Sequence, residues 1–421
     1  MVQLPGFYNI TGEVCKLDNR IKRYHRQPEN GRVLIIASVA SMIDQFNIPN
    51  IKILISMGYA VDIAANFKKG NTCTPEKIKE LLAKLDELQV DCYQIDFDRN
   101  VMDLQADVRA FRQLDSVMRR SAVTISGRTH YESPANYSFV HVQSPIGGAI
   151  GRVVARKNGI KTIYTAHGFH FYEGAPVKNW LLYYTAEFIL SYLTDILVTI
   201  NRYDYRMAVK KFHARKTVYV HGAGIDMEAF SKPGVSRKRM RKQLGIRDDE
   251  VLLVSVGELS RDKNQIDLLR AMRTLSKENY KCIICGIGPL EDRFKKYISR
   301  YRLKSAVKLL GFRTDIPDIL QASDMFVFPS NFEGLSVALM EAVAMKLPVV
   351  CSRVRGNTDT VISQESYFER FQPEQLIEAV RRVRKADNHN MIHRNFKHLK
   401  KFSLVHVSRE MKQVYTDIRI I

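Results

Sequence analysis

The amino-acid sequence predicts two α/β domains in succession, each built on a doubly wound parallel sheet. Short apolar runs, typical of strands buried on both faces, alternate with segments whose apolar residues repeat at helical spacing. This alternation begins near residue 32, stops at residues 222–224 (GAG), and begins again after the basic run 236–242. Two series of alternating strands and helices predict two such domains with a cleft between them.

The first series opens with a βαβ unit, in which the strand 33–39 and a helix ending at Gly58 precede the next strand. Its expected strands are 33–39, 59–64, 92–97, 139–142, 161–165, 196–200 and 217–220. Its expected helices are 48–57, 75–88, 102–119 and 146–157. The run 180–200 carries Glu187 and Asp195 and predicts a helix followed by a strand, because a membrane span needs about 20 residues with few or no charges.

The second series has the same rhythm. Its expected strands are 251–256, 281–285, 307–310, 325–329 and 349–351, and its expected helices are 264–275, 291–300, 316–321 and 336–344. The predicted organisation is an N-terminal extension without an assigned role (1–31), a first domain (32–222), a second domain (223–400) and a C-terminal helix (401–421). We expect that helix to pack back on the first domain.

Composition narrows the classes of protein. A chain of 421 residues with 45% hydrophobic and 26% charged residues is ordinary for a soluble protein of two or three domains, which excludes disordered, collagen-like and coiled-coil classes for the whole chain. The formal net charge of +21 favours an anionic partner. Nucleic acid, an acidic membrane surface and a phosphorylated substrate all fit this charge.

The six cysteines are scattered, which predicts reduced thiols in a cytosolic protein. Cys282 and Cys285 form a CxxC inside an apolar strand, where they point to opposite faces, and no second pair of ligands completes a zinc site. Charged residues interrupt the first twenty positions, so we expect no signal peptide. Any membrane contact is expected to be peripheral.

The strongest candidate site is residues 331–341 (NFEGLSVALME), which follow a predicted strand and open a helix. Gly334 permits close approach of a ligand, and the next amides, at Leu335 and Ser336, are free N–H groups of a helix start that suit a diphosphate.

Two acidic residues flank this helix start. If the segment is helical throughout, Glu333 and Glu341 lie roughly 12 Å apart, too far to share a proton or a metal ion. They fit two parts of one extended ligand, such as a sugar and a ribose. They equally fit a capped helix with two exposed acids, since an acid near a helix start is favourable in itself.

Two more candidate loops follow strands of the second series. In residues 257–264 (GELSRDKN), Arg261 and Lys263 are cations suited to neutralising a leaving diphosphate, although a solvated loop fits as well. Residues 286–289 (GIGP) resemble a phosphate-binding loop only through Gly286 and Gly288.

The fourth candidate is His167, at the end of a strand of the first series, where it suits an acid, a base or a polarising donor. A structural or surface histidine fits the same position. With His170 it forms an i, i+3 pair, but no further ligands support a metal site there. Asp96 and Asp98 form a D-x-D that we interpret as a surface turn.

These segments, in this order, resemble the retaining, family-4 glycosyltransferases of the GT-B fold, especially those that build bacterial capsular polysaccharides and exopolysaccharides. The resemblance covers about residues 32–359. The matching segments are 33–65, 141–152 (HVQSPIGGAIGR), 165–187, 194–205, 222–230, 255–264, 286–290, 324–341 and 348–359.

The resemblance implies that the second domain binds a nucleotide-activated sugar, usually a UDP-sugar. It implies that Glu341 hydrogen-bonds the ribose and that Glu333, with the amides of Gly334 and Leu335, positions the sugar and its phosphates. Lys263 corresponds to the cation that stabilises the departing diphosphate. Such enzymes require no divalent ion and no cofactor, because fixed cations and helix amides take the metal's role.

His167 corresponds to a histidine of the first domain near the reacting centre. Two departures from the family pattern stand out. Glu258 follows Gly257 where the family commonly has an arginine, a charge that Arg261 is a candidate to replace. Residues 37–41 (ASVAS) stand where the first glycine-rich loop is usual, which weakens a phosphate role there.

We therefore expect transfer of a hexosyl group from a UDP-sugar to a lipid-linked saccharide, with retention of configuration. Front-face attack is the favoured mechanism, and a double displacement stays open. Basic–apolar helices at 108–120 and 202–216 fit an anionic inner leaflet of the plasma membrane, or solvated faces. The alternatives are a GT-B epimerase of UDP-sugars and a nucleic-acid-binding protein, for which no recognition module is present and nucleic acid is not expected as a partner.

Overall fold

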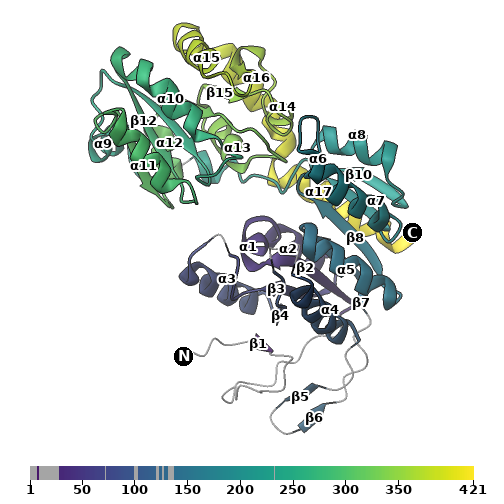
Figure 1. Cartoon of the computed structure of the whole chain (residues 1–421). Coiled ribbons are helices and arrows are strands. Elements are labelled where there is room, and N and C mark those ends of the chain that lie inside the picture. The colour runs from purple at the N-terminus through teal and green to yellow at the C-terminus, as the bar shows by residue number, and fades with distance from the viewer. Residues whose placement is uncertain are drawn as a thin grey trace. The chain divides into compact units, whose positions relative to one another are not determined.

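Buried parallel strands form the centre of each of two units in the computed structural model (Figure 1). The structure describes residues 7–8, 28–71, 73–98, 103–119, 123–125, 128–130, 137–231 and 233–421. Unit 1 comprises Met1–Ala223 and Ser408–Ile421, and unit 2 comprises Gly224–Val407. Both main sheets are parallel and carry helices, so the predicted fold class is confirmed.

Unit 1 contains an eight-stranded sheet of order β1-β4-β3-β2-β7-β8-β9-β10, with every neighbouring pair parallel. The strands are β1 (Phe7–Tyr8), β2 (Arg32–Val39), β3 (Ala60–Asn66), β4 (Asp91–Gln94), β7 (Tyr137–Gln143), β8 (Lys161–Ala166), β9 (Ile196–Thr199) and β10 (Lys216–Tyr219). The centre of β2 is inaccessible to solvent, which explains its continuous apolar sequence. A separate antiparallel pair joins β5 (Val123–Ile125) to β6 (Arg128–His130).

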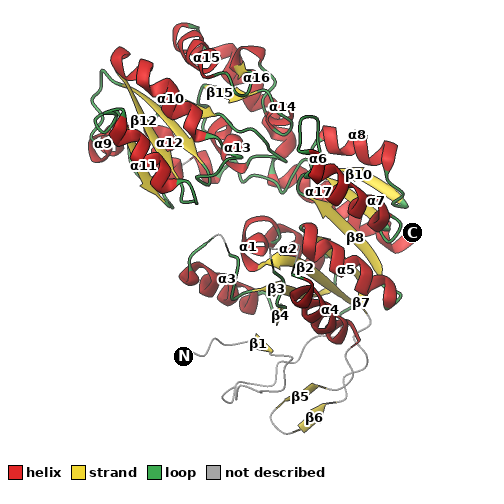
Figure 2. Ribbon diagram, viewed as in Figure 1, coloured by secondary structure: helices red, strands yellow, loops and turns green. Residues whose placement is uncertain are grey.

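Helices connect the strands of unit 1 (Figure 2). They are α1 (Ala40–Phe46), α2 (Ile48–Ser56), α3 (Pro75–Glu87), α4 (Leu104–Arg119), α5 (Pro145–Lys157), α6 (Val177–Asn179), α7 (Thr185–Ser191) and α8 (Arg202–Lys211), with a π-helical turn (Trp180–Tyr184) joining α6 to α7. Apolar residues of α4, α5 and α8 pack in one core cluster with Leu34 and Ile36 of β2. On β7, Phe139 stacks on Tyr415 of α17 (Leu404–Ile420), so the C-terminal part of α17 belongs to unit 1.

Unit 2 contains a six-stranded parallel sheet of order β13-β12-β11-β14-β15-β16. Its strands are β11 (Val251–Val256), β12 (Tyr280–Cys285), β13 (Val307–Gly311), β14 (Met325–Phe328), β15 (Val349–Ser352) and β16 (Tyr367–Phe368). Its helices are α9 (Arg237–Leu244), α10 (Gln265–Leu275), α11 (Glu291–Arg300), α12 (Ile316–Ala322), α13 (Val337–Ala344), α14 (Asn357–Thr360), α15 (Pro373–Lys385) and α16 (His389–Leu399). Short 3-10 turns lie at Ala229–Ser231, Ser276–Glu278, Gln364–Ser366 and Lys400–Phe402.

The two faces of this sheet carry separate cores. One contains residues of α9, α12 and α13 together with Cys285, and the other contains residues of α10, α11 and α15 together with Cys282. The two cysteines therefore point to opposite faces, as the strand pattern predicts. Burial raises the pKa of the Cys285 thiol to about 12, so this group stays protonated in the core.

Several boundaries differ from the sequence expectations. Helix α1 was not predicted, because it starts after Val39 without a side-chain cap, and β16 is too short to show a pattern. Strand β4 ends at Gln94 and not at residue 97, since the Asp96 amide donates to the Gln113 side chain of α4, which donates back to the Asp96 carboxylate, in place of a ladder pair. Most of the extension 1–31 lies outside the described residues, apart from β1 and residues 28–31. Among the described helices, none has the length and apolar character to cross a bilayer.

Candidate functional site

The strand order of unit 2 reverses at β11, which pairs with β12 on one side and with β14 on the other. Ligands of open α/β sheets bind beyond the carboxyl ends of the strands at such a point. The two loops that leave these strands are bonded to each other. The amide of Asn331 donates to the Asp262 carbonyl at 2.7 Å, and its side-chain Nδ2 donates to the Arg261 carbonyl at 3.0 Å. The fold thus brings two predicted segments, 257–264 and 331–341, together.

An ion pair between Lys263 and Glu333 lies at this junction. Lys263 Nζ is 2.5 Å from Glu333 Oε1, and the hydroxyl of Ser330 donates to the same oxygen at 2.7 Å. Glu333 is only 4% exposed, whereas the Lys263 side chain is 25% exposed. The carboxylate therefore holds the ammonium group in place while leaving part of it open to solvent.

The loop geometry explains why Lys263 is fixed. Asn264 adopts the left-handed conformation (φ 51°) that asparagine tolerates better than most residues, and it ends the loop at the start of α10. Its Nδ2 donates to Asp267 Oδ2 at 2.7 Å and to the Pro329 carbonyl at 3.2 Å. These bonds tie the residue beside Lys263 to the end of β14. A positioned cation at the carboxyl edge of a sheet is suited to an anionic ligand such as a diphosphate.

Helix α13 starts a few residues after Glu333 in the chain. Ser336 is its N-cap, and its side chain accepts a hydrogen bond from the Leu339 amide at 3.3 Å. Gly356, at φ 78°, packs its backbone against this segment, because a Cβ there would lie 2.6 Å from the Gly334 carbonyl oxygen. Within the described chain, the amides of Gly334 and Leu335 have no backbone acceptor, which keeps them available to a ligand.

Glu341 lies on α13, behind the helix start. The helix begins only at Val337, so the expected 12 Å separation from Glu333, which assumed a helix throughout, does not apply. Burial raises the pKa of Glu341 to about 7, and no donor among the described residues bonds its carboxylate. A half-buried acceptor without a partner suits a ligand that brings hydroxyl donors.

The glycines of the candidate loops allow close backbone packing. A Cβ on Gly286 would lie 2.0 Å from the Gly257 carbonyl oxygen, and one on Gly288 would lie 2.6 Å from the Leu259 amide nitrogen. The Leu259 amide donates to the Ile287 carbonyl at 3.1 Å. Gly286 and Gly288 are therefore needed to join the loops that follow β11 and β12, whatever ligand approaches them.

Arg261 lies in a different place from Lys263. Its exposed side chain lines a pocket of about 230 Å³ together with Arg293 and Asn331, and neither Lys263 nor Glu333 lines this pocket. The structure thus separates the two cations that the sequence analysis grouped in one loop.

In unit 1, His167 follows β8 and contacts Gln143, the last residue of β7. Its Nε2 lies 2.7 Å from Gln143 Oε1, and its ring packs on Phe46 at 4.9 Å between centroids. Burial lowers the pKa of His167 to about 4, so the ring is neutral at physiological pH. His170 contacts the ring of Tyr183 and joins no group of three potential metal ligands in the part of the chain that the structure describes.

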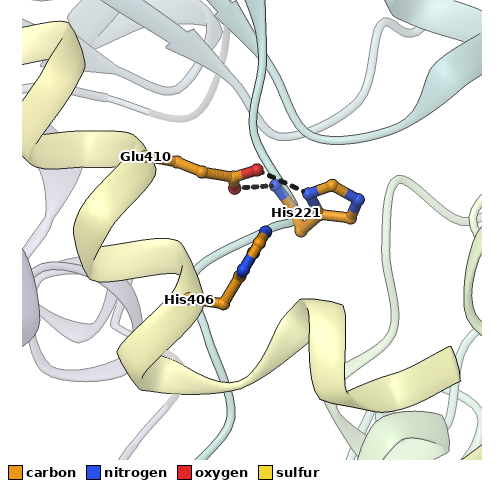
Figure 3. A group of neighbouring side chains, drawn as sticks. All are labelled: His221, His406 and Glu410. Atoms are coloured by element: carbon orange, nitrogen blue, oxygen red, sulfur yellow. Dashed lines mark hydrogen bonds and ion pairs between the residues drawn. The ribbon is translucent and has the colours of Figure 1, made fainter. Parts of the chain in front are cut away.

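A histidine–carboxylate pair that sequence reasoning missed anchors α17 within unit 1. The two oxygens of Glu410 accept from the backbone amide of His221 at 2.9 Å and contact its Nδ1 at 2.8 Å (Figure 3). His406 lies one turn earlier on the same helix. Since 189 residues separate the partners, no local pattern could reveal the pair.

Ser330, Gln143 and Asn47 are further partners of the site residues that were not predicted from the sequence. All three lie inside segments that carry the family resemblance (33–65, 141–152 and 324–341), which is the only sequence signal for them.

Two sequence families match the chain. The family described as "Glycosyl transferases group 1" matches residues 236–398, and the family described as "Glycosyl transferase 4-like" matches residues 130–201. The first match contains Lys263, Glu333 and Glu341, and the second contains Gln143 and His167.

Two curated relatives extend over most of the chain. The putative glycosyltransferase EpsD of Bacillus subtilis is 32% identical over 344 residues, which are 80% of this chain and 82% of EpsD. The UDP-Gal:alpha-D-GlcNAc-diphosphoundecaprenol alpha-1,3-galactosyltransferase of Escherichia coli is 29% identical over 294 residues, 67% of this chain and 76% of the relative. Among solved structures, Anabaena Alr3699/HepE in complex with UDP and glucose matches with a TM-score of 0.69 and 14% identity, covering 91% of this chain and 99% of that one. That last likeness concerns the fold alone.

Proposed function

This chain belongs to the group 1, GT4-like glycosyltransferases of bacterial polysaccharide biosynthesis, which have the GT-B fold, and on this premise we propose that it transfers a hexosyl group from a UDP-sugar to a lipid-linked saccharide with retention of configuration. The observation that carries the proposal is the Lys263–Glu333 pair at the carboxyl edge of the unit 2 sheet. The name of the E. coli relative includes both a UDP-sugar and a diphosphoundecaprenol acceptor, which supports both substrate classes.

The proposed chemistry needs stabilisation of a leaving diphosphate. The bond between the sugar's anomeric carbon and the phosphate oxygen breaks, and the acceptor oxygen bonds to that carbon on the same face. The acceptor's proton passes to the departing phosphate. Lys263 and the amides of Gly334 and Leu335 neutralise the charge that develops there, and such fixed groups contribute most of the rate in comparable sites. We propose that they also make a divalent metal unnecessary.

The test is a panel of UDP-sugars followed by product analysis. One UDP-sugar should raise the unfolding temperature above the others, because selective binding stabilises the folded state. With a lipid-linked saccharide and that donor, the glycoside formed should keep the donor's anomeric configuration by NMR, and EDTA should leave the rate unchanged. An altered free UDP-sugar formed without acceptor would instead indicate an epimerase. A panel with no stabilising UDP-sugar would contradict the proposal.

Glu341 gives a pH-dependent prediction. Its folded pKa of about 7 lies above the ordinary 4.5, so its contribution to stability is complete below about pH 4.5 and is lost as pH rises through 7. Without ligand, we expect the free energy of unfolding of Glu341→Gln to exceed that of the wild type by up to about 3 kcal/mol at pH 8 and to equal it at pH 4. Thermal unfolding across this range measures the difference. A stability gain that is independent of pH would contradict the assignment.

The same variant should bind UDP less well. If the ribose hydroxyls donate to the Glu341 carboxylate, they favour its ionised form, and UDP binding near pH 6.5 should release a proton. Calorimetry in buffers of different ionisation enthalpy detects that proton, and Glu341→Gln should not release it.

We also propose peripheral attachment to the inner face of the plasma membrane, through the helical segment 177–192 of unit 1. Its exposed large apolar side chains are Val177, Leu181, Leu182, Ile189 and Tyr192. Lys178 and the buried Glu187 are the only charged residues in the segment. Five exposed large apolar side chains within one helical segment mark an interaction surface.

The protein should co-sediment with anionic vesicles at low salt, because the net charge of +21 adds electrostatic attraction to the apolar contact. The double variant Leu181→Glu/Ile189→Glu should lose this binding, while Ile420→Glu, an exposed apolar position on α17, should keep it. Equal recovery in the supernatant with neutral and anionic vesicles would contradict membrane attachment.

A further inference from the structure

Two buried amide side chains form a chain of contacts to His167 in unit 1: Gln143 contacts His167, and Asn47 contacts Gln143. Gln143 ends β7, and Asn47 lies between α1 and α2; both are at most 1% exposed. We propose that Gln143 and Asn47 are positioning residues that hold His167 as the tautomer protonated on Nε2, so that Nδ1 is a hydrogen-bond acceptor for a substrate hydroxyl. The part concerning substrate rests on the proposed glycosyl transfer.

The Met42 backbone carbonyl, which can only accept a hydrogen bond, fixes the orientation of the Asn47 amide. Asn47 donates from Nδ2 to the Met42 carbonyl at 3.1 Å, and this identifies the nitrogen of its amide. The oxygen of that amide, Oδ1, accepts from Asn50 Nδ2 at 3.3 Å and also from the Gln143 amide. The orientation of Asn47 is therefore fixed by groups outside the pair.

The orientation of the Gln143 side-chain amide follows from that of Asn47. Since Asn47 Oδ1 accepts, the atom of Gln143 that contacts it is the donor Nε2. Asn47 Nδ2 donates back to Gln143 Oε1 at 3.1 Å, so the two amides form a reciprocal pair. The oxygen of Gln143 consequently faces His167 as an acceptor.

This arrangement allows only one neutral tautomer of His167. Its Nε2 lies 2.7 Å from Gln143 Oε1, so Nε2 must carry the hydrogen. Nδ1 then has a lone pair and no proton. Burial lowers the pKa of His167 to about 4, and the titratable group that interacts with it electrostatically is His141, itself buried and neutral.

This arrangement narrows the role of His167. A neutral ring with a free Nδ1 lone pair cannot act as a proton donor through Nδ1, and its low pKa makes it a weak base. The remaining role for Nδ1 of His167 is to accept a hydrogen bond from a hydroxyl. The specific contribution of Gln143 and Asn47 is to prevent the other tautomer, which would present a donor to the same hydroxyl.

Nitrogen-15 NMR of the histidine-labelled full chain tests the tautomer directly. Long-range proton–nitrogen correlations, with His167 identified by its loss in His167→Asn, should show a protonated Nε2 and an unprotonated Nδ1. His141 is an internal control, because it is bonded to Tyr415 and Thr165 and not to Gln143. A wild-type His167 protonated on Nδ1, or exchanging between tautomers, overturns the proposal without any variant being needed.

Two variants separate positioning from structure. Gln143→Leu removes the acceptor and should let both tautomers of His167 form, whereas Gln143→Glu keeps an acceptor and should retain Nε2–H. In transfer assays, Gln143→Leu should lower kcat/KM about tenfold, as for loss of one neutral hydrogen bond, and Gln143→Glu should recover part of it. An unchanged tautomer in Gln143→Leu contradicts the proposal. If the tautomer is as expected but no transfer occurs, the proposed function fails and the positioning stands.

Discussion

Lys263→Ala should lower the rate of glycosyl transfer at saturating donor by about 10²–10³-fold, the loss typical for removing one preorganised group that stabilises charge in a transition state. The reason is the geometry of unit 2: Glu333 and the end of β14 hold the Lys263 ammonium at the sheet edge, and its partial exposure leaves it open to an anion. Because the charge on the diphosphate grows as the sugar departs, the effect should fall on kcat more than on donor KM.

Removing Lys263 also leaves Glu333 buried without its cation, so stability must be measured beside the rate. The double variant Lys263→Ala/Glu333→Gln removes both charges. It should recover stability relative to Lys263→Ala but not the rate. Lys263→Arg should be intermediate, since a guanidinium keeps the charge but not its position.

Lys295→Ala is the matched control. Lys295 is an exposed lysine of unit 2 that pairs with Glu291 at 2.6 Å on the surface of α11. Its removal should leave the rate unchanged. If Lys263→Ala retained transfer within about threefold of the wild type, less than one kcal/mol of barrier, the site assignment would be wrong.

The residues of this site differ in how far the sequence could predict them. Lys263 and Glu333 were predicted separately, because each lies in a loop after a buried strand. Their direct bond follows from the strand order, which brings β11 next to β14. That order is a property of the whole sheet, and no periodicity within either loop contains it.

The Gln143–Asn47 amide pair shows more clearly why contacts between distant residues could not be predicted from the sequence. Gln143 and Asn47 are 96 residues apart, and each alone is an ordinary polar residue at the end of an element. Their pairing depends on the tertiary placement of α1, a helix that the sequence did not predict because it lacks a capping side chain. The glycines 286 and 288 illustrate the opposite case, in which a recognisable pattern is explained by backbone packing between two loops.

A buried ion pair in unit 1 carries the largest stability prediction. The Arg152 guanidinium on α5 forms two bonds with Glu187 of α7, at 2.9 and 3.1 Å, and the Arg152 side chain is 1% exposed. Its Nε donates to the Gly148 carbonyl at 2.9 Å, and Tyr164 donates to Glu187 at 2.9 Å while its ring lies 3.9 Å from the guanidinium carbon. Every polar partner in this cluster is therefore satisfied by another member.

Arg152→Ala should destabilise unit 1 by about 3–5 kcal/mol, because it leaves the Glu187 charge in the interior without a cation. Trp180 is the only tryptophan of the chain and packs against Phe171 in the same unit, so its fluorescence during urea denaturation reports the unfolding of unit 1. The double variant Arg152→Met/Glu187→Leu removes both charges and should recover part of the lost stability, since an apolar pair of similar volume needs no desolvation, whereas the buried Tyr164 hydroxyl loses its acceptor.

The control is another ion pair on the same helix. Lys157 of α5 bonds Asp115 at 2.9 Å, but its side chain is 42% exposed, so Lys157→Ala should cost no more than about 1 kcal/mol. The comparison isolates burial, because the helix and the kind of bond are shared. If Arg152→Ala and Lys157→Ala moved the urea midpoint equally, the cluster around Tyr164 would not be a buried charge network, and the packing of α7 on α5 would have to depend on its apolar contacts alone.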